Sequence, residues 1–130
     1  MKRILGIDYG TKNVGLALSD ERGDFAYPLT VLKNSPTLLN EIRKIQIENE
    51  IETVVFGDSK NYKGENNPIM GLLEPFIEIL KKETGLNIVF HPEFLSSVQS
   101  EKIQGKNDLT DASAAAIILQ SYLDTQKNKQ

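Results

Sequence analysis

The chain has 130 residues, of which 39% are apolar and 25% are charged, and its net charge is −3. This length is enough for one domain with a hydrophobic core and too short for two. Cysteine is absent, so any metal must bind oxygen ligands or the single histidine, His91. The negative net charge argues mildly against nucleic-acid binding without excluding a local basic surface. The N-terminus lacks signal-peptide features and no segment has the length of a membrane span, so we expect a cytoplasmic protein.

The first quarter of the chain predicts three strands joined as hairpins. Residues 2–8 are a short apolar run that ends in Asp8, and a turn at 9–13 follows. Residues 14–18 and 25–31 alternate between two faces with the period of a strand, and the polar segment 20–24 connects them. Pro28 interrupts the third strand, which favours a position at the edge of the sheet.

The rest of the chain alternates between helical and extended patterns. Ser35 and Pro36 predict a helix start, and helical spacing continues to Asn49. A strand at 53–57, a polar loop at 58–67, a helix at 68–84 and a strand at 87–90 follow. Pro75 predicts a kink in that helix, or a start near it. A short helix at 96–104 and a long helix at 110–124 complete the pattern.

This order predicts an α/β fold with a five-stranded mixed sheet. Strands in hairpins pair antiparallel, whereas strands joined by helical crossovers pair parallel. The sheet should therefore contain three antiparallel strands and then parallel strands, with helices on both faces. We expect a single domain at 1–124 and a polar C-terminal tail at 125–130.

Three carboxylates are candidates for a functional site. Asp8 ends a buried strand, where a charge is costly unless a metal or hydrogen-bond donors compensate it. Asp111 opens the last helix, where acidic residues are common because the helix dipole favours them. Glu93 follows the fifth strand, and beside it His91 could assist proton transfer, although a surface position is the simpler interpretation. Three carboxylates at one end of a sheet would bind two divalent ions suited to phosphodiester hydrolysis.

The polar loop after the fourth strand is a candidate substrate-binding element. It leaves the carboxyl end of a strand, where open α/β sheets place ligands. Lys60, Asn61 and Gly64 lie in it, together with a second lysine and an aromatic ring for base stacking. A surface turn is the alternative interpretation.

Two motifs resemble a known family. Residues 5–20 read LGIDYGTKNVGLALSD, and the last helix carries Asp111, Ala114, Ala115 and the segment ILQSYL at 118–123. Together they resemble the YqgF family of Holliday-junction-resolvase-like nucleases of pre-16S rRNA, which have the ribonuclease-H fold. The resemblance implies that Asp8, Glu93 and Asp111 are the catalytic carboxylates and bind Mg²⁺ or Mn²⁺. It also implies that Lys12 and the loop around Asn61 lie near the scissile phosphate.

The leading hypothesis is a divalent-metal-dependent endonuclease that matures the 5′ end of pre-16S rRNA. A Holliday-junction-resolvase-like DNA nuclease is the alternative within the same chemistry, and cutting two strands symmetrically would need a homodimer in place of a monomer. A non-catalytic binding module for nucleic acid or protein is the second alternative. It is motivated by Pro92 and Phe94, which stand where the family has an aspartate and an arginine around the glutamate. Gly6 to Thr11 also resembles the first phosphate motif of the actin and sugar-kinase superfamily, whose members need two such domains.

Overall fold

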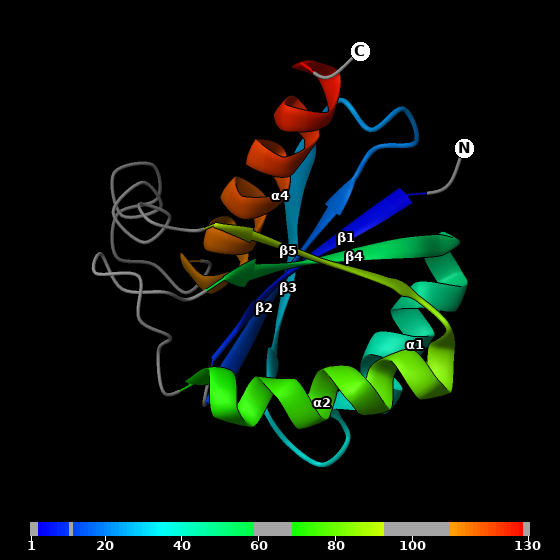
Figure 1. Ribbon diagram of the computed structural model, residues 1–130, viewed down its shortest axis with the longest axis vertical. Coiled ribbons are helices and arrows are strands. Elements are labelled where there is room, and N and C mark those ends of the chain that lie inside the picture. The colour runs from blue at the N-terminus through cyan, green and yellow to red at the C-terminus, as the bar shows by residue number, and fades with distance from the viewer. Residues whose placement is uncertain (1–2, 11, 59–68, 93–109, 129–130) are drawn as a thin grey trace.

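The computed structural model describes residues 3–10, 12–58, 69–92 and 110–128. Within these ranges the chain forms a five-stranded sheet covered by helices (Figure 1). The elements, in chain order, are β1 (Arg3–Tyr9), β2 (Asn13–Ser19), β3 (Ala26–Lys33), α1 (Leu38–Asn49), β4 (Ile51–Asp58), α2 (Ile69–Thr84), β5 (Asn87–Pro92) and α4 (Thr110–Asn128). The short helix predicted at 96–104 lies outside the described residues.

The strand order in the sheet is β3-β2-β1-β4-β5. β1 pairs antiparallel with β2, and β2 pairs antiparallel with β3. β4 pairs parallel with both β1 and β5, because α1 and α2 return the chain to the same end of the sheet. The predicted mixed sheet is therefore confirmed, and Pro28 lies in the edge strand β3 as expected.

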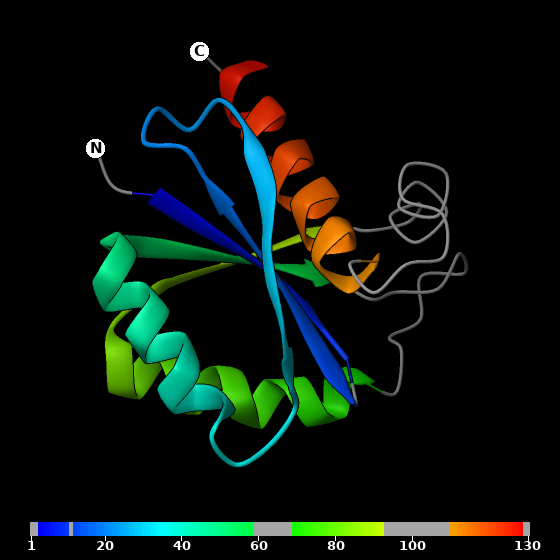
Figure 2. The same cartoon turned by 180° about the vertical axis from the view of Figure 1, so that it is seen from behind.

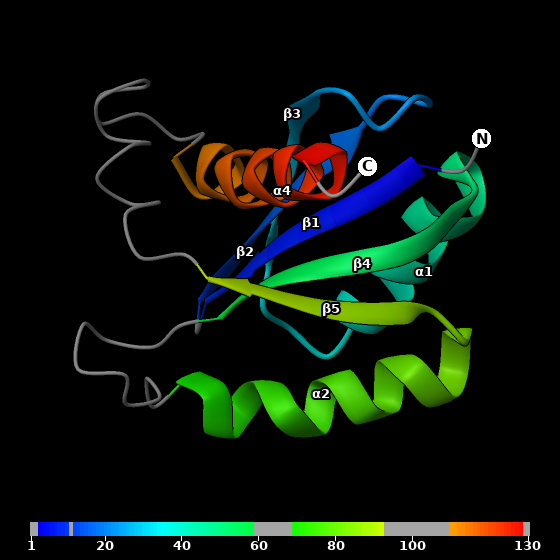
Figure 3. The ribbon, with the colours of Figure 1, turned by 45° about the horizontal axis from the view of Figure 1, so that its top comes forward.

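Helices cover both faces of the sheet, with α1 and α2 on one side and α4 on the other (Figures 2 and 3). Leu5, Ile7 and Phe56 are fully buried in the layer beneath α1 and α2. Ala17 and Val55 are buried in the second layer, against Ala115, Ile118 and Leu119 of α4. Neighbouring residues of a strand point to opposite faces, so the two layers divide each central strand between them.

The predicted start of α1 and the predicted end of α4 were wrong. α1 begins at Leu38 because Ser35 forms a turn first, in which its carbonyl oxygen accepts from the Leu38 N–H at 3.0 Å. α2 runs from Ile69 to Thr84, close to the predicted 68–84, and Pro75 lies inside it. α4 continues to Asn128, so residues 125–128 belong to the helix and not to a tail. Their side chains are polar but include good helix formers such as glutamine and lysine.

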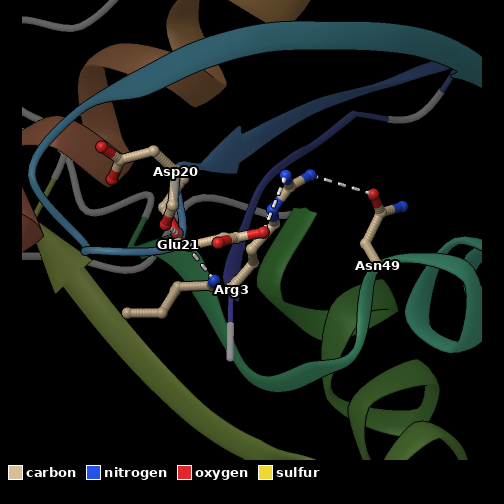
Figure 4. Close-up of polar contacts among 6 residues, drawn as sticks. Arg3, Asp20, Glu21 and Asn49 are labelled. Carbon is tan, nitrogen blue, oxygen red and sulfur yellow. Dashed lines mark hydrogen bonds and ion pairs between the residues drawn. The ribbon is translucent and has the colours of Figure 1, made fainter. Parts of the chain in front are cut away.

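Polar side chains tie together the end of the sheet where β1 begins (Figure 4). The Arg3 guanidinium lies 3.3 Å from Asn49 Oδ1, at the end of α1, and 3.8 Å from a carboxylate oxygen of Glu21. Ser19 is fully buried, and its hydroxyl accepts from the Ile4 N–H at 2.8 Å and donates to the Asp20 carbonyl at 3.0 Å. We call this end, with Arg3, Ser19, Asp20, Glu21 and Asn49, the amino end of the sheet. No helix in the described part of the chain is long and apolar enough to cross a membrane.

Candidate active site

Asp8 lies near the carboxyl end of the central strand β1 and is partly buried. Leu5 and Ile7 point into the layer beneath α1 and α2, and Ile4 packs in the layer beneath α4. The pleat of the strand therefore directs Asp8 to the α4 face, together with Gly6. Its partner on β2 is Gly15, whose lack of a side chain leaves this row of the sheet uncrowded on that side. We call this end of the sheet, where β1, β4 and β5 finish, the carboxyl end.

Helix α4 approaches the sheet most closely at Gly6. A Cβ atom added to Gly6 would lie 2.8 Å from Leu119 Cβ and 3.0 Å from the Ala115 carbonyl oxygen, so any larger residue would push the helix away. The alanines at 114–116 similarly allow a close approach, as their spacing in the sequence predicts. This close packing determines where the first turn of α4 lies.

The direction of α4 brings Asp111 toward the end of the sheet that carries Asp8. Gln120 bonds to Asp24 and Ala26, at the end of the sheet where β1 begins, whereas Ala115 lies against Gly6 in the middle of β1. From Ala115 back to Asp111 the helix spans about 6 Å, and from Gly6 on to Asp8 the strand spans about 7 Å. The backbone of Asp111 in the first turn of α4 therefore lies at about the level of Asp8, and Figure 3 shows this end of α4 on the same side of the view as the arrowheads of β4 and β5.

The turn after Asp8 is held in one conformation. A Cβ atom on Gly10 would lie 2.5 Å from the Asn13 carbonyl oxygen, so only glycine fits there. Asn34, just beyond β3, donates from its backbone N–H to the Lys12 carbonyl and from Nδ2 to the Gly10 carbonyl, both at 2.8 Å. The side chain of Lys12 is exposed. The sequence did not predict the contribution of Asn34, because no local pattern marks a contact between residues 24 positions apart.

His91, at the end of β5, is partly buried and does not occupy the simple surface position expected. Its Nε2 lies 2.8 Å from the Ser121 hydroxyl, and its ring stands edge-on to Tyr122 with centroids 6.1 Å apart. Burial lowers the pKa of His91 below its ordinary value, because desolvation disfavours the imidazolium. His91 thus fastens the end of β5, which leads to Glu93, onto α4, which carries Asp111.

The described residues include only part of the predicted site. Asp8 and Lys12 lie close together on consecutive segments, and Asp111 is placed by its backbone in the first turn of α4. Glu93, Lys60, Asn61 and Gly64 lie outside the described residues. Among the side chains that the structure describes, no three His, Cys, Asp or Glu gather at one point. The convergence of the three carboxylates therefore stays a prediction.

Sequence comparison places the chain among nucleases. A family model described as "RuvX: Holliday junction resolvase" matches residues 2–125. A relative from Thermoanaerobacter pseudethanolicus, named "Putative pre-16S rRNA nuclease", is 35% identical over 98% of this chain and 99% of its own length. A relative of the same name from Carboxydothermus hydrogenoformans is 37% identical over 94% of this chain and 96% of its own length.

Two similar solved structures have the same fold at low sequence identity. RuvC from T. thermophilus, in complex with a Holliday junction substrate, has a TM-score of 0.63 at 17% identity, over 98% of this chain and 96% of its own. The Fowlpox virus resolvase, in complex with Holliday junction DNA, has a TM-score of 0.58 at 13% identity, over 95% and 98%. These structures confirm the ribonuclease-H-like fold. The match of the family model over residues 2–125, together with the relatives at 35% and 37% identity, shows that the chain belongs to the RuvX family of Holliday junction resolvases.

Proposed function

We propose that this chain is a divalent-metal-dependent endonuclease that hydrolyses phosphodiester bonds at the 5′ side of pre-16S rRNA. The observation that carries the proposal is the position of Asp8. It lies on the α4 face of the central strand, at the end of the sheet toward which Gly6 and Ala115 direct the first turn of α4. The name shared by the full-length relatives supplies the substrate. A nuclease of precursor rRNA would act in the cytoplasm, where ribosomes assemble.

The proposed donor set fits a hard divalent ion. Asp8, Glu93 and Asp111 offer only carboxylate oxygens, and the chain contains no cysteine to favour a softer metal. We expect these three residues to hold Mg²⁺ or Mn²⁺, which would activate a water and stabilise the leaving oxygen of the phosphodiester. The protein then contributes mainly position and charge. The hydrogen bond between His91 and Ser121 supports that role, because it fixes the end of β5, which leads to Glu93, relative to α4.

A cleavage assay with Mg²⁺ or Mn²⁺ tests the proposal. The substrates are single-stranded RNA, a precursor-rRNA 5′ segment and a four-way DNA junction. Asp8→Asn keeps the size of the side chain but removes its charge, so cleavage should fall at least ~100-fold with the melting temperature preserved. Glu78→Gln, an exposed carboxylate on α2, is the matched control and should cut like the wild type.

The preferred substrate decides between two activities. The description of the RuvX family and the fold shared with RuvC favour junction resolution as the second candidate. Preferential cutting of the rRNA segment supports the first function, and symmetrical cutting of the junction supports the second. Full activity of Asp8→Asn would contradict both. A folded wild-type protein that binds these substrates and cuts none of them would instead indicate a binding module.

A further inference from the structure

Lys33 and Lys12 lie on adjacent segments at the carboxyl end of the sheet, as diagonal neighbours. Lys33 is the last residue of β3 and pairs with Asn13, the first residue of β2. The N–H of Asn34, the residue after Lys33, donates to the carbonyl of Lys12, the residue before Asn13, at 2.8 Å. The second bond of Asn34, to the Gly10 carbonyl, prevents the turn from swinging away from β3. The two lysines are therefore held at a fixed spacing by the backbone.

The pleat directs Lys33 to the same face as Asp8. One row of the sheet joins Asp8 to Gly15 on β2 and to Val31 on β3, so the three residues share the α4 face. Lys33 is two residues beyond Val31, with no irregularity in the pairing between them, and so points to that face as well. Two strand spacings and two residues put its Cα about 12 Å from that of Asp8. This corresponds to about three to four base-pair rises along a duplex.

The chain segments that carry the two lysines contain no carboxylate. No Asp or Glu occurs between residues 9 and 19 or between residues 25 and 40, although the chain contains 18 of them. Both side chains are exposed, and neither forms an ion pair with any residue in the described part of the chain. Lysines that only solvate a surface commonly alternate with carboxylates, whereas a site for phosphate requires cations free of competing anions.

We propose that Lys33 and Lys12 form a subsite for the phosphodiester backbone of the nucleic acid, a few nucleotides from the bond that is cut. The inference rests on the proposed nuclease function and adds to it a contact on the edge strand β3. The subsite recognises the charge of the backbone and not the identity of the bases, because lysine contacts to phosphate position a substrate without selecting its sequence. It also supplies the local basic surface that the net charge of −3 conceals.

The test measures binding of the full-length protein to a labelled precursor-rRNA 5′ segment and to a four-way DNA junction. Fluorescence anisotropy is recorded in the Asp8→Asn background between 50 and 300 mM KCl, so that cleavage does not interfere. Lys33→Ala should weaken binding about fivefold at 100 mM salt and reduce the slope of log K against log salt by about 0.7–0.9. Lys33→Glu should weaken binding further, and Lys33→Arg should retain the slope.

Lys44→Ala is the matched control, because Lys44 is an exposed lysine on α1, the helix that covers the opposite face. It should leave both affinity and slope unchanged. If wild type cuts nucleic acid but Lys33→Ala binds with an unchanged slope, the subsite is wrong and the nuclease function stands. If the wild type neither cuts nor binds any of these nucleic acids at 50 mM salt, the proposed function and the subsite are both wrong.

Discussion

The two ends of the sheet differ in how their polar groups are satisfied. At the amino end Arg3 contacts both Asn49 and Glu21, and the buried Ser19 hydroxyl has a donor and an acceptor. At the carboxyl end the lysines at 12 and 33 form no ion pair with any described residue. The polar groups described at the amino end thus serve the fold, whereas the two lysines at the carboxyl end remain available to a substrate.

The two ends of the sheet also differ in charge. A shallow cavity of about 250 Å³ at the amino end is lined by Glu21, Glu48 and Glu50, with Arg3 as the one cation among its lining residues. The carboxylates of this surface repel phosphate, so the amino end is disfavoured as a nucleic-acid-binding surface. The Arg3–Glu21 pair adds little stability, because both side chains are partly exposed and 3.8 Å apart. The buried hydroxyl of Ser19 is the more important stabilising contact.

The largest expected effect comes from Gly6, midway between the two ends. Gly6→Val would force its side chain against Leu119 and the Ala115 carbonyl, where even a Cβ atom lies within 3.0 Å. We expect the free energy of unfolding to fall by about 3 kcal/mol, measured by urea denaturation. Because α4 must shift, cleavage by the protein that remains folded should fall as well.

Gly85→Ala is the control for Gly6→Val. Gly85 has a φ of +71° and open space around its Cα, so alanine there meets conformational strain but no clash. We expect a loss of about 1 kcal/mol and normal cleavage per folded molecule. An equal loss of cleavage in both variants would show that the approach of α4 at Gly6 does not set the geometry of the site.

Ser19→Ala should affect the amino end alone. The substitution leaves the Ile4 N–H without its acceptor in a buried position, and we expect a loss of about 1–2 kcal/mol in stability. Thr125→Ala removes an exposed hydroxyl that bonds only to its own helix, and should change stability by less than about 0.5 kcal/mol. The cleavage rate of folded Ser19→Ala should match the wild type, and a slower rate would refute the separation of the two ends.

The fold was predictable because its signals are local. Period-two alternation, apolar runs and helical spacing gave the order of the elements, and connection type determined parallel or antiparallel pairing. Boundaries were less accurate where short-range hydrogen bonds decide them. The turn at Ser35 delayed the start of α1, whereas α2 continues through Pro75.

The candidate site was predictable only in part. Asp8 could be identified because a charge at the end of an apolar strand needs an explanation. The hydrogen bond from Asn34 to Gly10 joins residues 24 positions apart, and the one between His91 and Ser121 joins residues 30 positions apart. Neither pair has a sequence signature. Lys33 was missed for a related reason: it ends an ordinary edge strand, and only the register with β2 shows that it shares the face of Asp8.

The smallest expected effect has the opposite sign and lies in the first turns of α4. The Ser113 hydroxyl is buried and has no hydrogen-bond partner among the described residues, in contrast to the satisfied Ser19 at the amino end. Ser113→Ala removes this unsatisfied group and improves helix propensity, so stability should rise by about 1 kcal/mol, measured by thermal and urea denaturation. Ser121→Ala, the same change in the same helix, removes a hydroxyl that is bonded to His91 and should bring no gain. Equal effects of the two variants would show that helix propensity alone decides them. If Ser113→Ala gains stability but cleaves more slowly, the carboxyl end keeps an unsatisfied hydroxyl for function at the expense of stability.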